Sequence, residues 1–109
     1  MKLAIVGSRD LNVKNIDDYI PENVSEIVSG GARGIDSLAA KHAQEHGIKL
    51  TEILPDYKRF GRAAPIKRNE LIADYADEGI AFWDGKSRGT QSTIKFFEKR
   101  NKPIKIIII

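Results

Sequence analysis

Short apolar runs alternate along the chain with segments in which apolar and polar positions follow a helical period. The apolar, β-branched runs predict five strands, at residues 2–6, 25–29, 49–54, 79–83 and 104–109. The segments between them predict a weak helix at 13–19 and stronger helices at 34–46, 65–76 and 89–100. Each predicted strand is nearly all apolar or ends apolar, as expected for strands covered on both faces.

The predicted strands and helices follow one another through short connections. Such alternation favours right-handed crossovers and a parallel sheet between layers of helices. We therefore predict the α/β class, with a single Rossmann-like three-layer domain over residues 1–109 and a five-stranded parallel sheet. The longest irregular segment expected is 55–64, after the third strand.

Composition limits the classes of protein and partner. At 109 residues and 41% hydrophobic content, the chain can bury one modest core. It has no cysteine, which excludes disulfides, thiolate metal sites and thiol nucleophiles. The net charge is +3, and basic and acidic residues are interleaved. This composition indicates a mild preference for anionic partners. The apolar stretches at both ends are too short for a signal peptide or a membrane span, so we expect a soluble, cytoplasmic protein with no membrane partner.

Glycines and polar residues gather after the first four predicted strands. Because ligands of such sheets bind beyond the carboxyl ends of the strands, where strand order reverses, we expect these loops to converge on one cleft. Gly30, Gly31 and Gly34 allow positive φ and close backbone approach, and the helix that follows directs its unpaired N–H groups to the same place. That arrangement binds anions, although a tight turn alone explains the same glycines. A second glycine turn, "GKSRGT", follows the fourth strand, and the pair of turns favours phosphate.

The charged residues admit both a binding and a surface interpretation. The guanidinium groups of Arg9, Arg33 and Arg88 lie in glycine-flanked loops and suit phosphate or carboxylate. Solvated helix faces explain Arg62 and Arg68 equally well. We expect Lys41, Lys95, Lys99 and Lys102 to be solvated surface residues.

Five other side chains are candidates for a functional role. Asp36 stands in the first turn of a helix, where capping or bracing explains a carboxylate better than catalysis does. Asp84 fits either a ribose contact or the start of a turn, and Tyr57 fits base stacking. His42 and His46 are four residues apart on one helix, but we identify no third ligand and expect no metal site.

Four segments carry a resemblance to a known family: "IVGSRD", "IVSGGARGIDSLA", "PDYKRFGRAAPIKRNELI" and "AFWDGKSRGTQSTI". Together they resemble the YspA-type branch of the SLOG superfamily over nearly the whole chain. The resemblance implies a Rossmann-like domain that binds a nucleotide or a nucleotide-derived ligand. Whether that ligand is a signalling compound such as an ADP-ribose derivative stays open.

Two relatives of that superfamily imply different functions. "SGGARGID" is similar to the phosphate-binding turn of the DNA-processing protein A family, which binds single-stranded DNA. "GKSRGT" stands where the Lonely Guy phosphoribohydrolases carry a glycine turn followed by a glutamate that acts at the glycosidic bond. Here Gln91, Ser92 and Thr93 follow, so that glutamate is missing. Glutamine can neither stabilise an oxocarbenium ion nor activate water well.

We therefore rank nucleotide binding above two alternatives, an N-glycosidase or phosphoribohydrolase-like enzyme and a single-stranded DNA-binding protein. No cofactor is required beyond the nucleotide-type ligand. The wide apolar surface of helix 89–100, with Ile94, Phe96 and Phe97, predicts a homodimer or tetramer. The predicted ligand-binding residues are Gly7, Ser8, Arg9, Ser29, Gly30, Gly31, Ala32, Arg33, Gly34, Asp36, Tyr57, Arg62, Arg68, Asn69, Asp84, Gly85, Lys86, Ser87, Arg88, Gly89 and Thr90.

Overall fold

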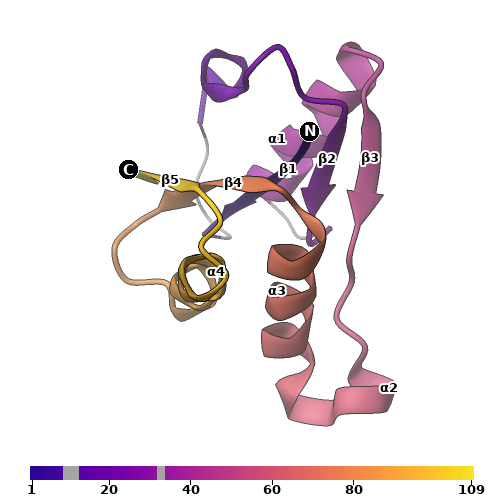
Figure 1. Cartoon of the computed structure of the whole chain (residues 1–109), viewed down its shortest axis with the longest axis vertical. Coiled ribbons are helices and arrows are strands. Elements are labelled where there is room, and N and C mark those ends of the chain that lie inside the picture. Colours follow the sequence, from indigo (N-terminus) through magenta and orange to yellow (C-terminus); the bar gives the residue numbers. More distant parts are fainter. Residues whose placement is uncertain (9–12, 32–33) are drawn as a thin grey trace.

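A computed structural model describes residues 1–8, 13–31 and 34–109. Strands and helices alternate along the chain, as the sequence pattern predicts (Figure 1). The elements are β1 (Lys2–Gly7), the 3-10 helix η1 (Ile16–Tyr19), β2 (Glu26–Ser29), α1 (Ile35–Glu45), β3 (Lys49–Glu52), α2 (Tyr57–Phe60), the 3-10 helix η2 (Gly61–Ala63), α3 (Ala64–Tyr75), β4 (Glu78–Trp83), α4 (Arg88–Lys99) and β5 (Ile104–Ile108). Within the described ranges, no helix has both the length and the apolar character needed to span a bilayer.

The five strands form one parallel sheet in the order β3-β2-β1-β4-β5. η1 and α1 pack on one face of the sheet, and α3 and α4 pack on the other. The structure thus confirms the α/β class and the three-layer Rossmann-like arrangement. Strand order reverses at β1, so the topological switch point lies where the carboxyl ends of β1 and β4 part.

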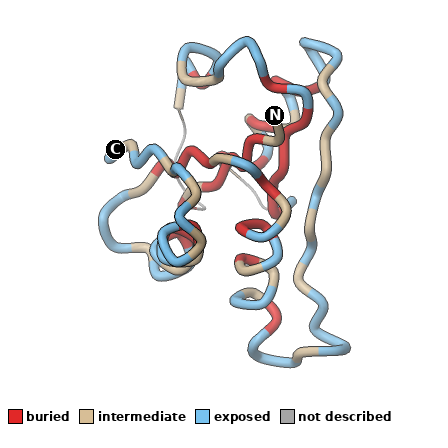
Figure 2. The backbone as a smooth tube through the Cα atoms, in the orientation of Figure 1, coloured by how far each residue is buried: buried red, intermediate tan, exposed pale blue. Residues whose placement is uncertain are grey.

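β1 lies at the centre of the sheet, and its side chains alternate between two apolar cores. Leu3 and Ile5 belong to the core shared with Ile35 of α1. Ala4 and Val6 belong to the core under α3 and α4. Figure 2 shows the burial concentrated in the inner strands and the helix faces toward them. A strand with helices on both faces must be apolar on both, which explains the unbroken apolar run in its middle.

The edge strands are less covered than the sequence pattern predicts. β3 and β5 contain no buried residue. On β5, Ile106 and Ile108 are 42% and 63% exposed. The expectation of two covered faces was therefore wrong at the sheet edges, because the helical layers are centred on the inner strands.

The apolar residues of α4 pack mainly onto their own sheet. Ile94 and Phe97 are buried in the core beneath α3 and α4. Phe96 is half-buried, and the Arg100 guanidinium lies 5.5 Å from its ring centroid. α4 thus uses much of its apolar surface inside the domain, and the homo-oligomer stays a prediction.

Two segments differ from their predicted structure. The weak helix expected at 13–19 is reduced to the single turn of η1. The segment 55–64, expected to be irregular, contains α2 and η2. The short helix α2 has a local cause, because Asp56 Oδ1 accepts the backbone N–H of Arg59 at 3.1 Å as an N-cap.

Lys102 is not the solvated surface residue that the sequence suggests. Its Nζ donates to the carbonyl oxygens of Ala73, Asp74 and Ala76, each at 2.8 Å. These carbonyls lie at the end of α3, where a helix leaves acceptors unpaired and favours a positive charge. Lys102 therefore caps α3 from the loop that precedes β5.

One carboxylate is built into the sheet. Glu26 begins β2 and is only 8% exposed. It accepts hydrogen bonds from Thr51 Oγ1 at 2.6 Å and from Tyr75 Oη. These bonds, the one from Thr51 foremost, lower the pKa of the Glu26 carboxyl. The carboxylate links β2 to β3 and to the end of α3.

We predict that Gly7→Ala destabilises the fold by about 1–3 kcal/mol, because α1 begins directly against the end of β1. A Cβ at Gly7 would lie 2.4 Å from Ile35 Cγ1 and 2.7 Å from Ile35 Cβ. Urea unfolding measures the change. In the matched control, Gly89→Ala, the added Cβ meets nothing within 4 Å. It should be neutral or stabilising by up to about 1 kcal/mol. Equal stability of the two variants would show that α1 is free to shift.

Candidate functional site

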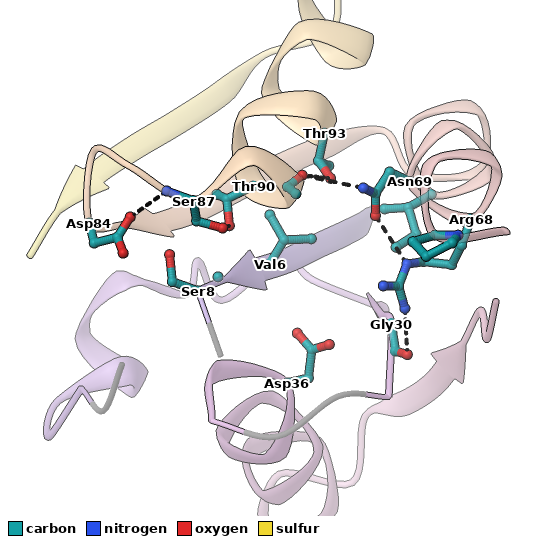
Figure 3. Close-up of a pocket in the computed structure, with 14 residues that line it drawn as sticks. Val6, Ser8, Gly30, Asp36, Arg68, Asn69, Asp84, Ser87, Thr90 and Thr93 are labelled. Carbon is teal, nitrogen blue, oxygen red and sulfur yellow. Dashed lines mark hydrogen bonds between the residues drawn. The ribbon is translucent and has the colours of Figure 1, made fainter. Parts of the chain in front are cut away.

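A cavity of about 400 Å³ opens at the carboxyl edge of the sheet. The end of β1, the beginnings of α1 and α4 and the first half of α3 surround it (Figure 3). It lies at the switch point between β1 and β4, where open α/β sheets bind ligands. Its volume falls within the usual range of small-molecule sites, roughly 300–1,000 Å³.

Within the described ranges, ten of the residues predicted from the sequence line this cavity. They come from the loops after β1, β2 and β4 and from α1, α3 and α4. They are Gly7, Ser8, Gly30, Asp36, Arg68, Asn69, Asp84, Ser87, Gly89 and Thr90. The loops after β1, β2 and β4 therefore converge at the cavity, whereas the loop after β3, which was expected to join them, does not line it.

The other predicted residues do not line the cavity or are not among the residues that the structure describes. Tyr57 and Arg62 lie on α2 and η2, beyond the first turn of α3, because the chain runs past the sheet before that helix begins (Figure 1). Tyr57 is 58% exposed. Six residues of the glycine turns are not part of the cavity lining: Ser29, Gly31, Gly34, Gly85, Lys86 and Arg88. Arg9, Ala32 and Arg33 lie outside the described residues.

Four lining residues were not predicted: Val6, Pro65, Ile72 and Thr93. Val6 and Ile72 have the character of core residues, and both belong to the core beneath α3 and α4. The helical period could have indicated two of these residues, because side chains three or four residues apart share one face of a helix. Ile72 follows Arg68 by four residues, and Thr93 follows Thr90 by three.

A chain of hydrogen bonds joins the two glycine turns through α3 (Figure 3). Arg68 Nη1 donates to the Gly30 carbonyl at 2.9 Å, and Arg68 Nε donates to Asn69 Oδ1 at 3.0 Å. Asn69 Nδ2 donates to the Gly89 carbonyl at 3.3 Å, which also accepts from Thr93 Oγ1 at 3.2 Å. The two side chains of α3 therefore hold the turn after β2 and the start of α4 at a defined separation.

Asp84 forms the turn after β4. Its Oδ1 accepts the backbone N–H groups of Lys86 and Ser87, both at 2.8 Å. The bond from Ser87, followed by that from Lys86, lowers the pKa of the Asp84 carboxyl. Of the two interpretations offered by the sequence, the structure shows the turn; Asp84 also lines the cavity.

Ser8 is the exceptional polar residue of the cavity. It is 6% exposed, and its Oγ has no hydrogen-bond partner in the described part of the chain. A buried hydroxyl without a partner costs free energy, so such groups are rare unless a ligand or water completes them. Figure 3 shows Ser8 on the side of the cavity toward Asp84, with Asp36 on a neighbouring wall.

The beginnings of α1 and α4 both contribute to the cavity, and neither has a side-chain cap. The residues before them, Gly34 and Ser87, make no capping hydrogen bond. In α4, Gly89 and Thr90 of the first turn line the cavity. Asp36, in the first turn of α1, is 8% exposed and lines it as well. The positive ends of two helix dipoles therefore lie at this cavity.

A third potential metal ligand, not identified from the sequence, lies near His42 and His46. Asp17 of η1 lies beside them, and a hydrogen bond joins its Oδ1 to His42 Nδ1. The spacing of the two histidines is visible in the sequence, but the approach of Asp17 depends on how η1 packs on α1. None of the three residues lines the cavity described above.

Comparison with known proteins identifies the family. The profile of the family described as DNA recombination-mediator protein A matches residues 1–107. The chain belongs to this family. The match confirms the relationship to the DNA-processing protein A family indicated by "SGGARGID". No curated protein and no solved structure gives a significant match.

In this member of the DNA recombination-mediator protein A family, the residue after the second glycine turn is not part of the cavity lining. Gln91 is exposed on α4, where it lines a separate surface hollow. The carboxylates of the described cavity lining are Asp36 and Asp84. Asp84 is exposed and accepts two backbone N–H groups, whereas Asp36 is buried in the cavity lining.

We predict that Asn69→Ala destabilises this family member by about 1–3 kcal/mol, because it breaks the link between α3 and α4 and leaves buried groups unpaired. Asn69 is 7% exposed. Lys67→Ala, on an exposed position of the same helix, should change stability by less than about 0.5 kcal/mol. Urea unfolding of both variants measures the difference. Similar values for the two would show that Thr93 alone holds the Gly89 carbonyl.

Proposed function

We propose that this protein binds a nucleotide or nucleotide-derived ligand in the cavity at the carboxyl edge of the sheet. The observation that carries the proposal is the buried Ser8 hydroxyl, which has no hydrogen-bond partner in the described chain and lies at the switch point. Membership of a family named for DNA recombination supports a nucleotide-type ligand. The cavity volume suits a single nucleotide rather than a macromolecule.

The polar groups of the cavity suggest how a nucleotide would lie. Ser8, Ser87 and Thr90 bring hydroxyl groups together near the start of α4. Hydroxyl donors and a helix N-terminus are the groups that bind phosphate oxygens in many proteins. We place the phosphate there, where the α4 dipole favours negative charge.

Asp36 would face the other end of the ligand. Its carboxylate is buried on the wall formed by α1 and repels phosphate, but it can accept hydrogen bonds from ribose hydroxyls or base amino groups. The wall with the hydroxyl groups also carries Asp84, whose Oδ1 accepts two backbone N–H groups, whereas the wall formed by α1 carries Asp36. Binding ranks above hydrolysis because Gln91 stands where a catalytic glutamate is required and lies outside this cavity.

We predict that Ser8→Ala weakens nucleotide binding by about 10- to 150-fold, the loss of one hydrogen bond to a charged group. The same change should leave the stability of the ligand-free protein nearly unchanged, because the hydroxyl has no hydrogen-bond partner among the described residues. Titration of wild type and variant with 5′-nucleoside monophosphates, ADP-ribose and cyclic dinucleotides, followed by thermal shift and calorimetry, measures both effects.

Ser92→Ala is the matched control, because Ser92 lies on α4 and lines the separate surface hollow. It should bind as wild type does. If no nucleotide in the panel raised the melting temperature of wild type, or if Ser8→Ala bound every nucleotide as tightly, the proposed site would be wrong. Release of free base at enzyme-like rates would instead favour the hydrolase, with Asp36 as the first residue to replace.

Single-stranded DNA is the second candidate ligand, favoured by the family match. A shallow surface hollow on α4 is lined by Arg88, Gln91, Ser92, Lys95, Phe96 and Lys99. Arg88, which lines this hollow, is flanked in the chain by Ser87 and Gly89, which line the main cavity. A strand with one nucleotide in the cavity could continue over these cations, which would contact its phosphates.

We predict that a strand using this path binds more tightly as its length grows from one to twelve thymidines, and more weakly as salt rises. Fluorescence anisotropy measures both trends. Lys95→Ala with Lys99→Ala should reduce the affinity for the long strand and leave the monophosphate unaffected. Lys41→Ala, an exposed control on α1, should change neither affinity. Equal affinity for the monophosphate and the twelve-nucleotide strand would exclude the DNA path while leaving the nucleotide site intact.

A further inference from the structure

Three metal-ligating side chains meet on the α1 side of the sheet, away from the cavity. Asp17 of η1 and His42 and His46 of α1 offer ligand atoms that all lie within 4.8 Å of one another. The imidazole rings of His42 and His46 stack with centroids 4.2 Å apart and an angle of 27° between their planes. The rings therefore present their nitrogens side by side. We call these three residues the Asp17–His42–His46 cluster.

Packing of η1 on α1 creates the cluster. Ile16, the residue before Asp17, is buried in the same core as Ala39 and Ala43 of α1. This contact places Asp17 against the last turns of the helix. The four-residue spacing of the two histidines puts both on one helix face, as in the paired histidines of many zinc sites. The same apolar contact that holds η1 therefore sets the position of the third ligand.

Two imidazoles and one carboxylate are a donor set for a borderline divalent transition metal. Zinc is bound by such ligands in sites that have three protein ligands and a water in the fourth position. Calcium and magnesium prefer oxygen donors and would be disfavoured here. Hydrogen bonding to His42 lowers the pKa of the Asp17 carboxyl.

We propose that the Asp17–His42–His46 cluster binds Zn²⁺ and so fastens η1 to the end of α1. Tetrahedral coordination requires ligand atoms about 3.3 Å apart. Asp17 and His46 are exposed and can adjust to that spacing, whereas His42, 6% exposed, is the fixed ligand. The metal replaces the direct hydrogen bond between Asp17 and His42. None of the three residues lines the main cavity, so the proposed metal site is separate from the proposed nucleotide site.

Calorimetry on metal-free protein without an affinity tag tests the proposal. Titration with ZnCl₂ should show one ion per chain. The melting temperature should rise by about 10 °C at a free Zn²⁺ concentration 100 times Kd. MgCl₂ should give neither effect. Co²⁺ should bind at the same stoichiometry and give the visible absorption of a tetrahedral site.

Variants at the two exposed ligands distinguish the effect of Zn²⁺ binding from the effect of the hydrogen bond between Asp17 and His42. Asp17→Asn and His46→Gln should each weaken Zn²⁺ binding by more than about tenfold. His46→Gln keeps the hydrogen bond between Asp17 and His42, so its metal-free melting temperature should match wild type. Asp18→Asn, on the next residue of η1, is the control and should bind Zn²⁺ as wild type does. Zn²⁺ that fails to bind wild type, or that binds all variants equally, would overturn the proposal and leave the cluster as a hydrogen-bonded contact only.

Discussion

The burial of β1 between two strands and two helical layers is the constraint on which the rest of the molecule depends. Its backbone pairs with β2 on one side and β4 on the other, and its side chains supply both cores. The last residue of β1, Gly7, lies against the first residue of α1, which admits no side chain there. The end of β1 therefore opens directly into the space between the beginnings of α1 and α4, and that space is the cavity.

Several polar residues around the cavity form hydrogen bonds within the protein. Asp84 closes its own turn, and Arg68 and Asn69 hold the two glycine turns apart. These hydrogen bonds form without a ligand, and a preformed arrangement reduces the cost of ordering on binding. Ser8 differs from these residues because its hydroxyl is buried without a partner in the described chain. The contrast between satisfied neighbours and one unsatisfied hydroxyl gives the nucleotide proposal its physical basis.

Much of the fold could be predicted from the sequence, because strand and helix signals are local. The apolar run of β1 and the glycines between "IVS" and α1 can be recognised from neighbouring residues alone. They indicate where a strand lies and where the chain turns into a helix. The predicted residues that directly follow a strand, such as Ser8 and Gly30, line the cavity. Tyr57 on α2 does not line it, because sequence order does not show that the chain leaves the sheet edge after β3. The sequence prediction also missed Thr93, whose helical spacing from Thr90 was the available signal.

The sequence by itself determined the alternation of strands and helices, the parallel sheet and the edge at which polar loops gather. These follow from periodicity and turn chemistry, which act over a few neighbouring residues. The tertiary structure alone decided which distant side chains meet: Lys102 with the end of α3, Glu26 with Tyr75, and Asp17 with the histidines of α1. Each meeting depends on how a helix lies on the sheet, and that position is set by the summed packing of many apolar side chains rather than by any local pattern.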